Sequence, residues 1–109
     1  MRRVDEAMRE VLSAAVSDLK DPRIGFITVT EVKTTPDLRH ARVFVSVLGD
    51  ATARSATLDG LASAHGVLQG SVARELRMKR TPTLEFVYDD TAERADRLGR
   101  LMDDVEASR

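Results

Sequence analysis

The sequence contains no cysteine and no tryptophan, and it has only three prolines and four aromatic side chains among 109 residues. Without cysteine the chain forms no disulfide framework, offers no thiolate nucleophile and has no thiolate ligands for zinc. No apolar run approaches the roughly 20 residues that cross a bilayer. The N-terminus enters a charged amphipathic segment directly, without the apolar core of a secretion signal. We therefore expect a cytoplasmic protein with no membrane contact.

Catalytic motifs are missing as well. The only histidines are His40 and His65, and neither has a serine or cysteine nucleophile arranged with it in the sequence. The phosphate-binding patterns Gly-x-x-x-x-Gly-Lys and Gly-x-Gly-x-x-Gly are absent. One acidic cluster could in principle hold a hard cation, but helix capping explains part of it more simply; it consists of Asp89, Asp90, Glu93 and Asp96. We expect no catalytic residue, no metal site and no cofactor.

Charge is unevenly distributed along the chain, although the formal net charge is only -1. Residues 39–80 carry seven basic and three acidic side chains, whereas residues 81–109 carry four and eight. Fourteen of the 17 basic residues are arginine, whose planar guanidinium suits phosphate contacts. A coding bias toward arginine is an equally good explanation for that preference. The basic middle segment is the first candidate for binding a polyanion.

Hydrophobic spacing predicts four helices and three strands. The predicted elements are a helix over 2–19 ended by Asp21-Pro22, strands over 24–33 and 39–48, a helix capped by Asp50 that meets Gly66, a helix carrying Leu68, Val72 and Leu76, a strand over 84–88, and a helix over about 91–107 whose capping box is Asp90 with Glu93. The order αββααβα predicts an α+β protein with a three-stranded sheet covered on one face by helices. We expect a single domain over 1–109, with a core over about 2–89 and the C-terminal helix beyond it.

The aromatic residues are expected to serve the core. Phe26, Phe44, Phe86 and Tyr88 all fall within the predicted strands, which favours packing over stacking on bases.

Five segments, in order along the chain, resemble the ribosome-binding factor A family, and αββααβ is the order of a type II KH domain. The segments are Asp21-Pro22-Arg23-Ile24-Gly25-Phe26, Thr28 to Val32, Thr35-Pro36-Asp37-Leu38-Arg39-His40-Ala41 with Val43 to Gly49, Ala64-His65-Gly66, and Pro82 to Asp90. The resemblance covers nearly the whole chain. Ala64-His65-Gly66 is similar to the family's alanine-x-glycine joint between two short helices.

The resemblance implies a non-catalytic bacterial factor with a KH-like RNA-binding domain. It would bind the small (30S) ribosomal subunit and its 16S rRNA during late maturation and rRNA processing, as a monomer, with ribosome-associated GTPases as further partners. An ordinary KH domain holds single-stranded RNA in a Gly-x-x-Gly loop, and this chain has no such sequence. Reading of a single strand in that manner is therefore not expected.

The RNA-binding candidates are the joint and the basic residues near it. They are Ala64, His65 and Gly66 at the joint, Gly70, Arg74 and Arg77 on the wet face of the following helix, Lys79 and Arg80 at its end, Arg39 and Arg42 on the hairpin, and Lys20 and Arg23 around the first turn. Each has a simpler explanation. In that explanation, Gly66 simply caps a helix, Arg80 simply offsets the helix dipole, and the other charged side chains are ordinary solvated surface.

A second function also fits the sequence. The amphipathic, acidic last helix could dock a protein partner without any RNA contact, because a small α+β domain hosts many functions.

Overall fold

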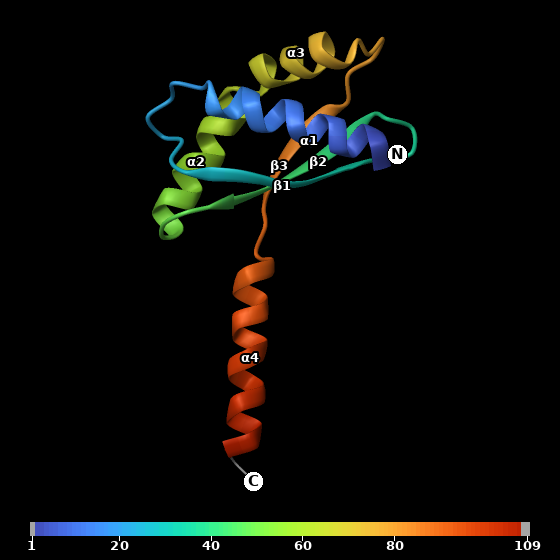
Figure 1. Cartoon of the computed structure of the whole chain (residues 1–109). Helices are drawn as coiled ribbons and strands as arrows, with labels where there is room; N and C mark the ends of the chain where they lie inside the picture. Colours follow the sequence, from blue (N-terminus) through green and yellow to red (C-terminus); the bar gives the residue numbers. More distant parts are fainter. Residues whose placement is uncertain (1, 108–109) are drawn as a thin grey trace.

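The computed structural model describes residues 2–107. Its elements, shown in Figure 1, are α1 (Arg2–Ser17), β1 (Ile27–Thr34), β2 (His40–Val47), α2 (Ala51–Ser63), α3 (His65–Leu76), β3 (Thr83–Tyr88) and α4 (Thr91–Ala107). The predicted order of helices and strands is confirmed.

The three strands form one sheet in the order β1-β2-β3. β1 and β2 pair antiparallel as a hairpin, with Ile27 opposite Val47, and the register shifts at Thr30. β3 pairs parallel to β2, with Ala41 opposite Leu84. A parallel neighbour needs a crossover connection, and α2 with α3 supplies it. As a result, β3 begins at the end of the sheet where the β1–β2 loop lies, which we call the hairpin end.

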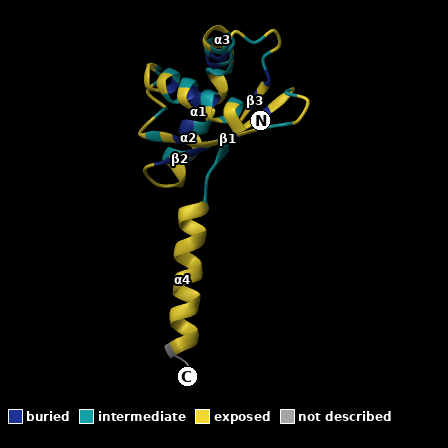
Figure 2. Ribbon diagram, turned by 45° about the vertical axis from the view of Figure 1, so that its right-hand side comes forward, coloured by how far each residue is buried: buried dark blue, intermediate teal, exposed yellow. Residues whose placement is uncertain are grey.

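One face of the sheet is covered by α1, α2 and α3, and the other face is open (Figures 1 and 2). The alternation in β2 explains why, because Ala41, Val43, Val45 and Val47 are all buried while the residues between them face outward. Helix α1 contributes one buried residue per turn to the same core, and α3 lies beside it. The buried hydrophobic residues of the helices are Met8, Leu12, Val16, Leu61, Leu68 and Val72.

Two element boundaries differ from the prediction by two residues or more, and the strands otherwise differ from it by one residue at an end. Helix α1 ends at Ser17 and relaxes into a turn in which Leu19 still donates to the carbonyl of Val16. Strand β1 begins at Ile27, because residues 21–24 form a turn closed by the backbone bond from Ile24 to Asp21. Phe26 therefore precedes the strand and is 80 % exposed, so the prediction that it packs in the core is wrong.

Helix α4 projects from the body of the protein and is exposed from Thr91 to Glu106 (Figure 2). Its apolar residues Leu98, Leu101, Met102 and Val105 recur at helical spacing, yet each is about 60 % exposed. Among the described residues, no helix is long and apolar enough to cross a membrane.

The base of α4 is tied to the body by two carboxylates. Asp89 accepts hydrogen bonds from the Thr30 hydroxyl at 2.7 Å and from the Thr91 backbone N–H at 3.0 Å. These bonds, with that of the Thr91 hydroxyl, lower the pKa of Asp89. Glu93 accepts from Arg54 of α2 at 3.0 Å and from the hydroxyl of Tyr88.

The predicted capping box is wrong in its pairing. Glu93 does not turn back to Asp90, because Arg54 and Tyr88 on the body hold its carboxylate. Asp90 instead pairs with Arg94 at 2.9 Å, and Asp96 pairs with Arg100 at 2.6 Å. The residues of the acidic cluster are thus each engaged by neighbouring side chains or backbone.

Because α3 is packed in the core and α4 is exposed, replacing a leucine by alanine should destabilise the protein far more in α3 than in α4. Leu68→Ala opens a cavity in the core and should lower the free energy of unfolding by about 3 kcal/mol. Leu101→Ala, on exposed α4, should change it by less than about 0.5 kcal/mol. Urea unfolding followed by circular dichroism measures both. Comparable losses in the two variants would show that α4 packs on the body in solution.

Candidate nucleic-acid interface

The joint between α2 and α3 is a single residue. Ala64 has φ -88° and ψ 7°, which lies outside the helical region and separates the two helices without a left-handed turn. Its N–H donates to the carbonyls of Gly60 and Leu61, and its own carbonyl accepts from Leu68. The chain thus leaves one helix and starts the next within one residue, with no side chain capping α3.

Gly66 lies in the first turn of α3 and does not terminate α2. Its backbone is not in the left-handed region, so the expectation that glycine permits the break there is wrong, and the break falls at Ala64. A Cβ at position 66 would meet no atom within 4 Å. Nothing inside the protein requires glycine here, although glycine costs about 1 kcal/mol relative to alanine within a helix. The exposed backbone is open to close approach from outside.

Four sequence-predicted residues share the outer face of α3, opposite buried Leu68 and Val72. They are Gly66, Gly70, Arg74 and Arg77, and both arginines are exposed. Arg74 bends back over the helix, so that its guanidinium lies 3.6 Å from where a Cβ of Gly70 would be and 3.4 Å from the Ser71 hydroxyl. His65, at the joint itself, is half-buried.

Arg77 ends α3 in the left-handed conformation, with φ 50° and ψ 42°. Glycine is the usual residue at such a position, and a residue with a Cβ is strained there by roughly 1 kcal/mol. Arg77 therefore lies at the point where the chain turns from α3 toward β3, and the surrounding structure offsets its strain.

The structure gathers basic residues from four separate segments at one end of the molecule, which we call the basic end. Its members are Arg2 and Arg3 of α1, Lys33 of β1, Arg39, His40 and Arg42 around the start of β2, and Arg77, Lys79 and Arg80 at and after the end of α3. In Figure 1 the N-terminus, the β1–β2 loop and the α3–β3 loop lie on the same side.

Three contacts establish this arrangement. Arg3, Leu76 and Met78 line one surface hollow, which places the start of α1 beside the end of α3. The backbone N–H of Thr83 donates to the carbonyl of Arg39 at 2.8 Å, which joins the α3–β3 loop to β2. Asp5 accepts from both the N–H and the hydroxyl of Thr34, which fastens α1 to the end of β1.

Sequence reasoning missed four members of the basic end: Arg2, Arg3, Lys33 and His40. Alternation in the hairpin could have indicated that Lys33, His40 and Arg42 share the open face, because each is exposed and adjoins a buried strand residue, Val32 or Ala41. Arg2 and Arg3 join the group only through the packing of α1 on α3, for which the sequence carries no local signal.

Lys20 and Arg23 lie at the other end of the sheet, in the α1–β1 connection. The Arg23 guanidinium donates to both oxygens of Asp21, with a shortest distance of 2.6 Å, and this bonding lowers the pKa of the Asp21 carboxyl. Lys20 is exposed. The structure therefore separates these two residues from the basic end. Their segment packs instead on α2 at Thr57 and Gly60, one turn before the joint.

Comparison with known proteins agrees with this fold and sequence. The family model for ribosome-binding factor A matches residues 1–102. The chain belongs to the ribosome-binding factor A family. A family member from Geobacter sulfurreducens is 44 % identical over 108 residues, covering 98 % of this chain and 92 % of that protein. One from Anaeromyxobacter sp. strain K is 51 % identical over 102 residues, covering 92 % and 74 %.

Solved structures of the family share the architecture. The crystal structure of ribosome-binding factor A from Thermus thermophilus superimposes with a TM-score of 0.71 at 29 % identity, covering 80 % of this chain and 93 % of that one. A homology model of the Thermus thermophilus protein, fitted into a cryo-EM map of its complex with the 30S subunit, gives a TM-score of 0.66 and covers 76 % and 88 %.

Two substitutions of Arg77 separate the effect of its strained backbone on stability from the effect of its charge. Arg77→Gly should raise the free energy of unfolding by about 0.5–1 kcal/mol, because glycine adopts the left-handed conformation freely. Arg77→Ala loses the same charge but keeps the strained backbone, and should not gain stability. Chemical denaturation compares the two. Equal stabilisation of both variants would mean that charge repulsion, and not the backbone, is what destabilises the wild-type protein at this residue.

Proposed function

We propose that this protein is a non-catalytic ribosome biogenesis factor that binds the small (30S) ribosomal subunit and its 16S rRNA in the cytoplasm, during late maturation and rRNA processing. Membership of the ribosome-binding factor A family supports the proposal, as does the complex of the Thermus thermophilus relative with the 30S subunit. Ribosome-associated GTPases are proposed as further partners, and the KH-like body over about 2–89 as the RNA-binding domain.

The observation that carries the proposal is the outer face of α3. Gly66 leaves the backbone open in the first turn of the helix, Gly70 lies beneath the Arg74 guanidinium, and Arg77 follows at the end of the helix. Within residues 2–107, neither arginine has a carboxylate partner. Guanidinium groups without a carboxylate partner, on the same helix as an exposed backbone at Gly66, suit contacts with RNA phosphates.

The joint acts through geometry in this proposal. A one-residue break at Ala64 sets the direction of α3, and α3 exposes Arg74 and Arg77 to solvent. No Gly-x-x-Gly loop is present to clamp a single strand. The expected contact is therefore with the backbone of folded RNA and not with the edges of its bases.

One observation favours the rival function of protein docking through α4. Its apolar residues stand at positions i, i+3, i+4 and i+7, the spacing with which a helix fills a partner's groove, and they are Leu98, Leu101, Met102 and Val105. Such docking would bury apolar surface and would respond weakly to salt, whereas phosphate contacts respond strongly.

Sedimentation with purified small subunits, large subunits and naked RNA at two salt concentrations tests the proposal. We expect a preference for small subunits and a logarithm of affinity that falls linearly with the logarithm of salt concentration. Arg74→Glu with Arg77→Glu should weaken binding at least about tenfold without unfolding the protein, because each lost charge-assisted hydrogen bond costs about 1.5 kcal/mol or more.

The matched control reverses two charges on α4, as Arg94→Glu with Arg97→Glu. It should bind like the wild-type protein. Loss of binding in this control alone, or association that salt leaves unchanged, would favour docking through α4. No association of the wild-type protein with small subunits at either salt concentration would contradict the proposed function.

A further inference from the structure

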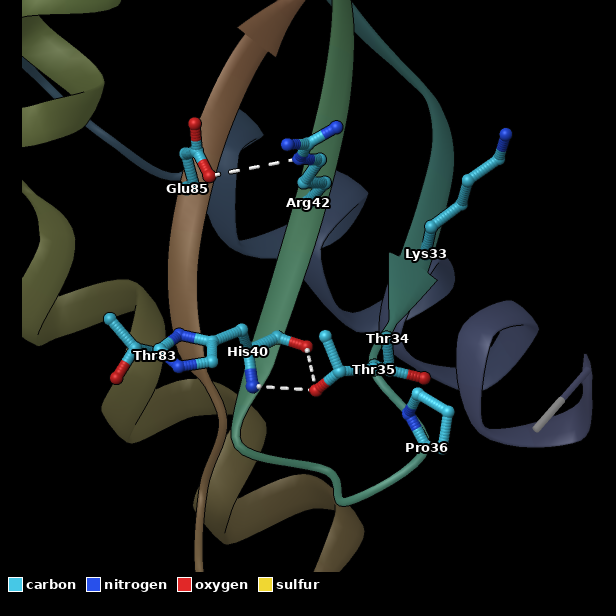
Figure 3. Close-up of a pocket in the computed structure, with 8 residues that line it drawn as sticks. All are labelled: Lys33, Thr34, Thr35, Pro36, His40, Arg42, Thr83 and Glu85. Carbon is cyan, nitrogen blue, oxygen red and sulfur yellow. Dashed lines mark hydrogen bonds and ion pairs between the residues drawn. The ribbon is translucent and has the colours of Figure 1, made fainter.

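A groove crosses the open face of the sheet at the basic end, and it is separate from the outer face of α3. Its volume is 590 Å³, and it is lined by Lys33, Thr34, Thr35, Pro36, His40, Arg42, Thr83 and Glu85. Figure 3 shows the long side chains of Lys33 and Arg42 rising from neighbouring strands, with the His40 ring beside Thr83. The lining holds three basic side chains and one carboxylate.

The ion pairs in this groove are too weak to prevent its cationic side chains from binding another anion. Arg42 lies 3.8 Å from Glu85 and Lys33 lies 3.9 Å from Glu31, and all four side chains are more than half exposed. Exposed pairs of this kind contribute little, typically below about 1 kcal/mol. A phosphate oxygen can therefore replace either carboxylate as a partner at small cost.

The hairpin that forms one wall of the groove is held in place by its own hydrogen bonds. The Thr35 hydroxyl donates to Asp37 at 2.6 Å and accepts from the N–H of His40 at 3.1 Å. The N–H of Thr35 donates to the His40 carbonyl at 2.9 Å. The bonds from the Thr35 hydroxyl and the Arg39 backbone N–H also lower the pKa of Asp37. The cationic side chains thus stand on a fixed backbone.

More cations continue the groove along the edge of the molecule. Arg39 lies at its rim, and its carbonyl is bonded to Thr83 in the lining. Lys79 and Arg80 are exposed in the loop that leads into Thr83, and within the described part of the chain neither has an ion-pair partner. Positive charge therefore extends in a line over several residues, which suits a ligand with successive negative charges better than one small anion.

We infer that this groove is a second RNA contact, in which Lys33, His40 and Arg42 bind consecutive phosphates of a folded RNA strand. The inference rests on the proposed function and adds a site to it. No Phe, Tyr or Trp lines the groove, so cationic side chains predominate in its lining and the recognised chemistry is the phosphodiester backbone. Arg39, Lys79 and Arg80 carry the contact along the same strand.

The test compares two triple variants of the full-length chain that remove three basic side chains each. Lys33→Gln with His40→Gln and Arg42→Gln alters the groove, and Arg94→Gln with Arg97→Gln and Arg100→Gln alters α4. Binding is measured to small subunits and to a 16-base-pair RNA duplex across a range of salt concentrations. The groove variant should bind each at least about tenfold more weakly, and the slope of log affinity against log salt should be smaller by about 3, roughly 0.9 for each of the three phosphate contacts. The α4 variant should match the wild-type protein.

A second groove variant, Lys79→Gln with Arg80→Gln, changes only loop residues and guards against a folding defect in the first. Unchanged affinity and slope in both groove variants, with binding still lost in the charge-reversed α3 variant, would overturn the groove while leaving the proposed function standing. Equal weakening by the α4 variant would overturn the groove as a specific site. Failure of the wild-type protein to bind small subunits would contradict the proposed function itself, whatever the duplex shows.

Discussion

The packing of α1 against α3 over one face of the sheet is the constraint on which the rest of the structure depends. Met8 and Leu12 are fully buried with Leu68 and Val72 of α3, and together they seal the core above the strands. The two helices run in opposite directions, because residues near the start of α1 meet the end of α3 and Asp18 meets Ser71. This arrangement brings the start of α1 and the end of α3 to the hairpin end of the sheet, and so it creates the basic end.

The same packing separates charges of opposite sign in space. The basic end collects cations from four segments, whereas the C-terminal part of α4 carries Asp103, Asp104 and Glu106 well away from it (Figure 1). At physiological salt, charges interact over roughly 8 Å, so the distant carboxylates do not cancel the local positive field. A net charge of -1 is therefore compatible with a polyanion-binding surface, and the uneven distribution would orient the protein as it approaches RNA.

Sequence reasoning succeeded where the determining interactions are local. The 3.6-residue and 2-residue periods identify every helix and strand, and Asp50 caps α2 as predicted, accepting from the N–H of Ala53 at 2.9 Å. It failed where distant residues decide. Glu93 has the spacing of a capping box, but Arg54 and Tyr88 on the body hold its carboxylate. Phe26 is a local exception: it has the composition of a strand residue, but the neighbouring turn at residues 21–24 delays the strand and leaves the ring in solvent.

The candidate interface shows the same division. Alternation and helical spacing place the exposed arginines of α3 and β2 correctly on outward faces. They say nothing about which of those faces adjoin, and so Lys20 and Arg23 were grouped with residues of the basic end, which lies at the opposite end of the sheet (Figure 1). The groove itself depends on β3 pairing parallel to β2, a non-local contact that brings Thr83 beside His40.

The central claim is that RNA lies against the basic end and the outer face of α3. Ultraviolet crosslinking of the protein in complex with small subunits, followed by mass spectrometry of the protein peptides attached to rRNA, tests it most directly. The account predicts crosslinks within residues 33–42 and 74–83. Crosslinks confined to α4 or to the segment around Lys20 and Phe26 would contradict it.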